Sequence, residues 1–383
     1  MRRRDATTTL VLLAVGLLAV DVSLDSAAAE DRAPRGDIFL SEMRLDTLKL
    51  RIERRIEPTY AAWLDLQSRA DGLLDRRHHA PEHWYVPGYY RDAVGHSQAK
   101  QGLQDDANAV YELALCWRMT GDERYAEAAV RLIDGWVNTV QSTSREEDST
   151  LSFSYHFPAM IFGADLLASW PGFSADRQDA FRRFCRQTAL PLNTMDRSNN
   201  WGNWGLVLVL ACARYLDDDG LLDRGEQRWK ELLDRQIDNR GHLHHEVRRG
   251  GGRQGIWYSH FSLFPQTIAA EILRGAGRDL YDWRSPEGHT LRQAFEPLAG
   301  WTREPASFPY WDGDPQRLTG VTYFSYFEIL NERWSHEDAA MLLRQSRPMT
   351  ARHSAPVLTF THGGLLKDGS ATDSPGTRKP AGS

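Results

Sequence analysis

The sequence predicts an all-α protein that folds as an α/α toroid, an incomplete barrel of stacked helical hairpins. Three observations indicate this fold. Helix-like segments recur in pairs, the pairs follow one another at a spacing of about 45 to 65 residues, and polar and aromatic residues gather where the more apolar helix of each pair begins.

The first pair covers residues 105–140. Ala109, Leu113 and Cys116 share one apolar stripe, the helix ends at residues 120–122, and an amphipathic helix follows through Trp136. The same arrangement recurs at residues 154–187, where Ser174 is the expected N-cap, at 204–238 and at 259–301, and a fifth copy begins at residues 322–334. Stacked hairpins of this kind bury the first helix and expose the second.

If the stack closes, the inner helices begin near one rim and the residues there converge. These residues are Asp105, Asp106, Tyr155, His156, the segment 199–204 and the segment 258–260. The segment "NNWGNWG", Asn199 to Gly205, is the most informative, because Asn and Gly are poor helix formers and buried amides need partners. We therefore expect its polar and aromatic side chains to face a groove.

The ends of the chain carry different signals. A basic start, a short apolar run over residues 9–20 and three alanines at 27–29 predict a signal peptide over residues 1–29, which favours a periplasmic or secreted protein. An uncleaved membrane anchor is the alternative. Residues 30–363 are predicted to form the toroidal catalytic domain and residues 364–383 a disordered tail, because its stretch "KDGSATDSPGTRKPAGS" has nothing to bury.

Composition limits the partners. The formal net charge of -6 argues against nucleic acid, and after signal cleavage we expect a monomer without stable membrane association. The three cysteines each lie in an apolar or helical run, so we expect them in the core and not in a disulfide framework. The cluster of His242, His244 and His245 does not have the spacing of a standard metal site, and we expect neither a metal nor another cofactor.

One reaction matches the remaining polar residues. Tyr258 follows the Arg-rich loop "RRGGGR", and nearby cations can stabilise a phenolate. Cleavage of a polyuronate by β-elimination requires neutralisation of the C6 carboxylate, removal of H5 and protonation of O4. Amides such as Asn200, with Arg or His, can perform the first task, and a tyrosine can perform the other two.

The segments "NNW", "EVRRG" and "GIWYSHFSLFPQTIAAEILRGAGRDLY", with the helix pair "YELALCWRMTGDERYAEAAVRLIDGW", resemble the alginate lyase superfamily, especially the polysaccharide lyases that act on mannuronan and glucuronan. The resemblance covers roughly residues 84–301. It implies an α/α toroid, Tyr258 as acid and base, Asn200 as a neutralising amide, and a catalytic Arg upstream of the tyrosine. Arg253 is the first candidate for that Arg and Arg249 the second.

The sequence departs from the family pattern at Trp201, which occupies the position of a histidine in the best-known alginate lyases. His245, His260 or His156 are the candidates to replace that histidine, and none is singled out by spacing. The expected substrate-binding residues are Asn199, Trp201, Trp204, Tyr155, His156 and His260. Mannuronate and glucuronate differ at C2, away from the reacting atoms, so the sequence leaves the choice between alginate and glucuronan open.

Two other functions remain open at this stage. A glycoside hydrolase on a similar toroid would use two carboxylates, for which Asp105, Asp106, Glu246, Asp312 and Asp314 are candidates. A noncatalytic protein that binds an acidic polysaccharide would use the same aromatic and Arg side chains.

Overall fold

The computed structural model describes residues 37–311 and 321–366, which all belong to one compact unit. The predicted signal peptide, residues 367–383 of the predicted tail, and the candidate carboxylates Asp312 and Asp314 lie outside the described residues. None of the helices in the described ranges is long and apolar enough to cross a membrane.

Helices dominate the described part of the chain. The first half contains α1 (Glu42–Glu53), α2 (Thr59–Asp71), β1 (His83–Trp84), α3 (Ala93–Thr120), α4 (Glu123–Thr139), β2 (Ser142–Thr143), α5 (Ser149–His156), α6 (Pro158–Leu166), α7 (Ala175–Phe184), η1 (Cys185–Ala189) and η2 (Leu190–Leu192). The second half contains α8 (Asn200–Tyr215), α9 (Asp219–Gln236), η3 (Arg249–Gly252), α10 (Gly255–Gly275), α11 (Leu291–Arg303), η4 (Pro305–Ser307), η6 (Val321–Phe324), α12 (Phe327–Trp334), α13 (Glu337–Ser346) and α14 (Leu358–His362).

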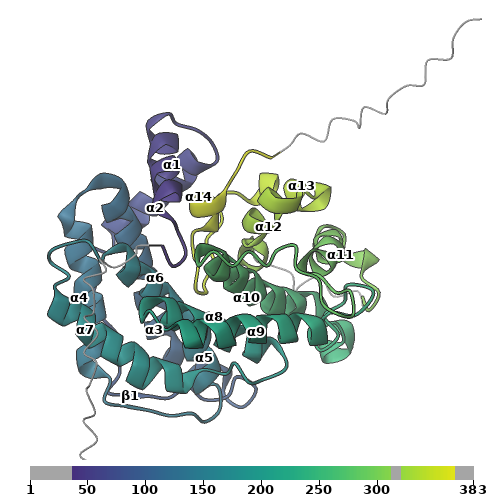
Figure 1. Cartoon of the computed structure of the whole chain (residues 1–383), viewed down its shortest axis with the longest axis horizontal. Coiled ribbons are helices and arrows are strands. Elements are labelled where there is room, and N and C mark those ends of the chain that lie inside the picture. Colours follow the sequence, from purple (N-terminus) through teal and green to yellow (C-terminus); the bar gives the residue numbers. More distant parts are fainter. Residues whose placement is uncertain (1–36, 312–320, 367–383) are drawn as a thin grey trace, which may run out of the picture. The chain divides into compact units, whose positions relative to one another are not determined.

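Helical hairpins form the predicted two layers. The inner helices pack in sequence, α3 against α6, α6 against α8 and α8 against α10 (Figure 1). Their outer partners α4, α9 and α11 pack against α3, α8 and α10 respectively. The inner helices α6, α8 and α10 are buried along most of their length; in α8 only Trp201 and Arg214 retain some exposure. This burial explains why the sequences of these helices are almost wholly apolar.

Local signals set the ends of the hairpin helices. Gly121 ends α3 in the left-handed region, with φ of 75°, and Asp122 then caps α4 by accepting from the Arg124 backbone N–H. Asp218 caps α9 in the same way. Ser174 occupies the N-cap position of α7 as predicted, although its side chain makes no capping hydrogen bond.

Two inner helices differ from the prediction. α3 begins at Ala93, well before residue 105, so Asp105 and Asp106 lie within the helix and not at its mouth. The first helix of the pair predicted at residues 154–187 is divided into α5 and α6, because Pro158 has no N–H for the helical ladder and begins a new helix. Tyr155 and His156 consequently lie at the end of α5.

The first and last helices of the unit meet. α14 packs against α2 and α1, and α12 packs against α14 (Figure 1). β1 and β2 form a short parallel pair, with His83 opposite Ser142.

The three cysteines, Cys116, Cys185 and Cys212, are buried and unbonded, which confirms their prediction as core residues.

Candidate active site

A cavity of about 1170 Å³ opens where α3, α5, α8 and α10 approach the loops before α3 and α14. Three of the predicted catalytic residues, Asn200, Arg249 and Tyr258, line it together. Its other lining residues are Tyr89, Tyr90, His96, Ser97, Lys100, Gln104, Asp148, Leu151, Tyr155, Asn199, Trp201, Gln254, Trp257, Phe261, Tyr323, Arg352 and His353.

The start of α8 supplies one wall. The Asn199 side chain caps the helix by accepting from the Trp201 backbone N–H at 3.2 Å, which leaves Asn200 as the first helical residue. Asn200 is almost completely buried and still reaches the cavity. Trp201 is the partly exposed member of this turn, and the Arg197 guanidinium lies 5.9 Å from its ring centroid.

The rest of the "NNWGNWG" segment is structural. The Asn203 amide donates to Gln236 Oε1 at 2.8 Å and to Ser262 Oγ at 2.7 Å, and so ties α8 to its neighbours. A side chain at Gly205 would meet the Met195 backbone nitrogen at 2.3 Å, so glycine permits the preceding loop to pack on the helix. Only the first turn of the segment therefore faces the cavity.

Glu246 connects two cavity residues from behind. Its Oε1 accepts from Asn200 Nδ2 at 2.9 Å and from the Asn200 backbone N–H at 3.2 Å, and its Oε2 accepts from Arg249 Nε at 3.2 Å. The Glu246 side chain is about 1% exposed. A buried carboxylate with donors on both oxygens holds the amide and the guanidinium in fixed relative positions.

The glycines after Arg249 turn the loop into α10. Gly250, Gly251 and Gly252 all have positive φ, and a side chain at Gly252 would meet the Tyr310 carbonyl oxygen at 2.0 Å. This turn lays the Arg249 guanidinium over the Tyr258 ring, 4.6 Å from its centroid. Tyr258 belongs to the first turn of α10, where its backbone N–H donates to the Gln254 carbonyl.

The Tyr258 hydroxyl lies 2.6 Å from the Tyr90 hydroxyl, and either group can donate. Burial raises the pKa of the Tyr258 phenol, and the Tyr90 hydroxyl raises it further, whereas Arg249 lowers it. The pKa of Tyr258 is therefore raised overall, whereas the sequence led us to expect that nearby cations would lower it. The effect of burial on this pKa is larger than the effect of the Arg249 guanidinium. Tyr258 is thus a neutral phenol near pH 7 when the cavity holds no substrate.

The loop that carries Tyr90 is anchored to the start of α5. Glu147 Oε2 accepts from the Tyr85 hydroxyl at 2.9 Å and from the Gly88 backbone N–H at 2.6 Å, and Glu147 also pairs with Arg91. Tyr90 itself is 75% exposed. The anchored loop therefore presents an exposed tyrosine to the Tyr258 phenol.

Aromatic rings form the wall beside Tyr258. Trp257 stacks on Phe261 with centroids 5.0 Å apart, and Tyr323 lies edge-on to Trp257. Tyr155 also lines the cavity, as predicted, and contacts Phe261. Such faces are suited to the apolar faces of sugar rings.

Several predicted site residues lie elsewhere. Arg253 is exposed and does not line the cavity, and the exposed His245 packs against His244. Trp204 is fully buried behind Tyr155 and Phe261, so it supports the aromatic wall without lining the cavity. None of these three residues lines the cavity.

His156 and His260 also lie in the interior. His156 is fully buried against Tyr155, and burial lowers its pKa well below the usual value. His260 is on the far side of α10 from Tyr258, with Nδ1 2.9 Å from the Tyr326 hydroxyl and Nε2 2.7 Å from Thr302 Oγ1. Burial lowers the pKa of His260 to about 3, so it remains neutral.

The cavity contains residues that sequence reasoning missed. Tyr90, His96, Lys100, Arg352 and His353 all line it. The aromatic and glycine-rich stretch "YVPGYYRD" is a signal by which Tyr90 could have been found. His353 lies in a loop far along the chain from α8, which ends at Tyr215, and no spacing in the sequence indicates that the two meet.

The carboxylates proposed for hydrolysis are not paired in the cavity. Asp106 is buried and bound to Arg76, His79 and Trp136, and Glu246 lies behind Asn200. Among the described residues that line the cavity, Asp148 is the one carboxylate. Within residues 37–311 and 321–366, no three His, Cys, Asp or Glu side chains are grouped so as to hold a metal ion.

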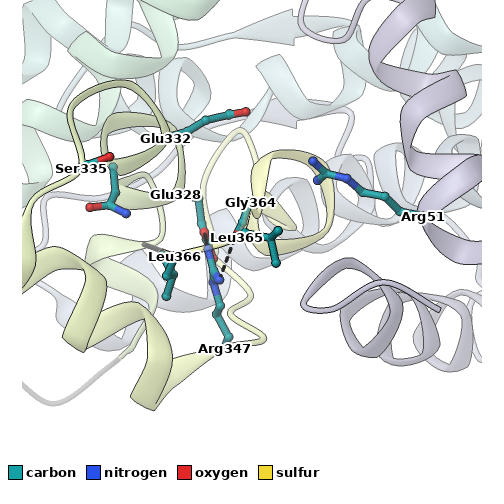
Figure 2. Close-up of a pocket in the computed structure, with 9 residues that line it drawn as sticks. Arg51, Glu328, Glu332, Ser335, Arg347, Gly364, Leu365 and Leu366 are labelled. Carbon is teal, nitrogen blue, oxygen red and sulfur yellow. Dashed lines mark hydrogen bonds and ion pairs between the residues drawn. The ribbon is translucent and has the colours of Figure 1, made fainter. Parts of the chain in front are cut away.

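A smaller cavity of about 260 Å³ lies between α1, α12 and the segment after α14 (Figure 2). Its central residues are Glu328 and Arg347, which form a buried ion pair with Nε to Oε1 at 2.9 Å, and Arg347 also donates to the Gly364 carbonyl at 3.0 Å. Thr359 donates to the same Glu328 carboxylate. These contacts hold the last described residues against α12, and the cavity is separate from the tyrosine site.

Comparison with known proteins identifies similar sequences. The family model described as Alginate lyase matches residues 57–308. A polysaccharide lyase of Stenotrophomonas maltophilia (strain K279a) is 30% identical over 124 residues, which are 32% of this chain and 36% of that relative. The matched region thus spans about a third of the relative's length.

Solved structures share the fold. Alginate lyase A1-III from Sphingomonas species A1 superposes with a TM-score of 0.64 at 15% identity, over 86% of this chain and 97% of that chain. A histidine-to-alanine variant of alginate lyase A1-III complexed with a tetrasaccharide gives 0.71 at 16% identity, over 88% and 97%. An alginate lyase from Bacteroides ovatus gives 0.65 at 17% identity, over 86% and 99%. The predicted α/α toroid is confirmed.

Proposed function

Because the chain belongs to the alginate lyase family, as the sequence resemblance predicted, we propose that it is an exported polysaccharide lyase that cleaves a β-1,4-linked polyuronate by β-elimination. The observation that carries the proposal is the meeting of Asn200, Arg249 and Tyr258 in one cavity, with Glu246 joining the first two. These three side chains supply the groups that the reaction requires.

Asn200 and Arg249 are assigned to the C6 carboxylate of the uronate residue. When H5 leaves, negative charge moves onto the carboxylate oxygens. Hydrogen-bond donors that are held in place stabilise this transition state more than they stabilise the bound ground state. Arg249 rather than Arg253 is now the preferred cation, because Arg249 lines the cavity and contacts the tyrosine ring.

Tyr258 is assigned as base and acid. Its phenolate oxygen removes the proton from C5, the C5–H electrons form the C4–C5 double bond, and the C4–O4 bond breaks. The same oxygen returns the proton to O4, so the tyrosine ends as it began. One group can serve both ends because H5 and O4 lie on the same face of a mannuronate or glucuronate ring.

The raised pKa of Tyr258 means that one proton must leave the Tyr258 and Tyr90 pair before the reaction. Arg249 is the cation that favours the phenolate within this pair. The cavity aromatics Trp201, Trp257 and Tyr155 are assigned to the sugar faces. Mannuronate-rich alginate and glucuronan are the proposed substrates.

The test is incubation of the protein, with chelator present, with polymannuronate, polyguluronate and glucuronan in separate reactions. Absorbance of the unsaturated uronyl product is followed in each. A rise on polymannuronate or glucuronan is the expected result. New reducing ends without that absorbance would mean hydrolysis instead, and binding without either product would mean a noncatalytic polysaccharide-binding protein.

A further inference from the structure

The loop between α13 and α14, residues 347–357, supplies two residues to the lining of the larger cavity, Arg352 and His353. The His353 ring lies against Tyr155, with centroids 5.0 Å apart, and its centroid is 5.8 Å from that of Phe261. No described residue of α13 or α14 itself lines this cavity. The conformation of the loop therefore decides where these two side chains lie.

Both ends of the loop are fastened to one carboxylate of α12. Arg347, the first residue of the loop, donates through Nε to Glu328 Oε1 at 2.9 Å (Figure 2). Beyond the other end, the Thr359 hydroxyl donates to the same Glu328 oxygen at 2.8 Å and accepts from the Met349 backbone N–H at 3.1 Å. Glu328, Thr359 and Met349 are buried. The two ends are thus joined through Glu328 in the interior, where hydrogen bonds are electrostatically stronger than in water.

The tip of the loop is docked on α5. Ser354 donates twice to the Tyr155 carbonyl oxygen, from its backbone N–H at 3.1 Å and from its Oγ at 2.9 Å. Within the loop, the Ala351 backbone N–H donates to the Pro356 carbonyl oxygen at 2.7 Å. Ser354 has a φ of 36°, in the left-handed region that residues other than glycine rarely adopt. Such a conformation persists only where the surrounding contacts hold it.

The bonds at the base and the strain at the tip belong to one short loop. Without the Thr359 hydroxyl, the Met349 N–H loses its acceptor and the start of the loop loses one of its two links to Glu328. Ser354 is then free to relax toward an ordinary φ. Because His353 directly precedes Ser354, this relaxation moves the His353 ring away from Tyr155.

We propose that Glu328 and Thr359 are positioning residues for the lyase reaction, which hold the 347–357 loop so that Arg352 and His353 line the cavity. The inference rests on the proposed function. Neither Glu328 nor Thr359 lines the larger cavity, so both act through the loop. If they served only to attach the last helix, their loss would change stability without changing turnover.

Thr359 is the better residue to alter. Glu328→Gln would leave the buried Arg347 guanidinium without a counter-charge and so threaten the fold itself. Thr267→Val is the matched control, because Thr267 is an equally buried threonine of α10 whose hydroxyl donates to the Leu263 carbonyl of its own helix at 2.9 Å. Thr359→Val and Thr267→Val both replace one interior hydroxyl by a methyl group.

Initial rates on polymannuronate or glucuronan give the first readout. Thr359→Val should lower kcat/KM about five- to twentyfold, since small displacements of groups in an active site are costly. Thr267→Val should remain within about twofold of the unaltered protein. Thr359→Ser keeps the hydroxyl, so it should restore most of the activity that Thr359→Val loses.

Hydrogen exchange observes the loop directly. The Ala351 and Ser354 amides, which both donate within the described loop contacts, should exchange at least about fivefold faster in Thr359→Val and at the original rate in Thr267→Val. A further comparison adds Thr359→Val to a variant in which Arg352 and His353 are both replaced by Ala. The loop then has no cavity side chain to place, so Thr359→Val should lower kcat/KM by less than about twofold in that background.

Equal kcat/KM values of Thr359→Val and Thr267→Val would overturn the positioning role. An undiminished effect of Thr359→Val in the background without the two loop side chains would overturn it as well, as would unchanged exchange of the loop amides. Failure of the unaltered protein to cleave any polyuronate would instead overturn the proposed function, and the exchange rates test the anchoring of the loop independently of activity.

Discussion

Asn200 and Glu246 form a buried hydrogen-bonded pair, with Asn200 Nδ2 2.9 Å from Glu246 Oε1. The other oxygen of the same carboxylate accepts from Arg249, so a residue outside the cavity lining aligns two that line it. Replacement of Glu246 by Gln keeps an acceptor for Asn200 but turns a donor amide toward Arg249. Glu246→Ala removes both contacts.

We expect Glu246→Gln to lower kcat/KM by about tenfold and Glu246→Ala by about a hundredfold or more, since misplaced groups lose transition-state contacts. Glu246→Ala should also lower the free energy of unfolding by about 1–3 kcal/mol, because it leaves buried donors without acceptors. Kinetics and urea unfolding of both variants measure the two effects. Equal activity of the Gln and Ala variants would contradict a positioning role.

Tyr258→Phe tests the acid and base assignment. The fold should persist, because the ring keeps its contacts with Arg249 and Trp257, and kcat should fall by about 10²–10⁴. Affinity for an oligouronate should change only a few-fold. Near-normal turnover in a folded variant would exclude Tyr258 from proton transfer.

Arg249 and Arg253 are distinguished by separate alanine substitutions. Arg249→Ala should reduce kcat by about 10²–10³, as is typical when one charge-stabilising donor is removed, whereas Arg253→Ala should remain within a few-fold of the unaltered protein. Product absorbance under saturating substrate measures both. A greater loss at Arg253 would reverse the assignment that the cavity geometry favours.

Tyr90→Phe tests the coupling of the two hydroxyls. The Tyr90 hydroxyl raises the pKa of Tyr258, so its removal should lower that pKa and increase the fraction of phenolate at a given pH. The alkaline rise of kcat/KM should therefore move to lower pH. A profile measured from pH 6 to pH 10 decides this, and a shift to higher pH would show that Tyr90 stabilises the phenolate.

Because His260 is buried in its neutral form, we expect the folded protein to lose stability in acid. Its folded-state pKa of about 3 lies below the unfolded value of 6.5, so the unfolded chain binds the proton more strongly between these pH values. The contribution of His260 is complete above about pH 6.5 and is lost as pH falls, by about 1.4 kcal/mol per pH unit. Urea unfolding of His260→Asn at pH 7, 6, 5 and 4 should show a shallower pH dependence than the unaltered protein. Parallel curves would contradict the buried neutral state.

Much of the fold was predictable because helices are encoded locally. Apolar spacing and capping residues such as Asp122 act within one or two turns, so the hairpins could be assigned before the structure was known. The polar start of α8 and the loop before α10 likewise indicated Asn200, Arg249 and Tyr258 as site residues. The length of α3 and the break at Pro158 were the local features that escaped prediction.

Tertiary structure alone decided which of the candidates meet. Tyr90 and Tyr258 are 168 residues apart and their hydroxyls are 2.6 Å apart, and Asn200 and Glu246 are separated by 46 residues. The sequence determined the helices and the chemical types available at their ends, because those depend on near neighbours. The choice of Arg249 over Arg253, and the burial of Trp204 and His260, depend on how distant segments pack, which no local pattern records.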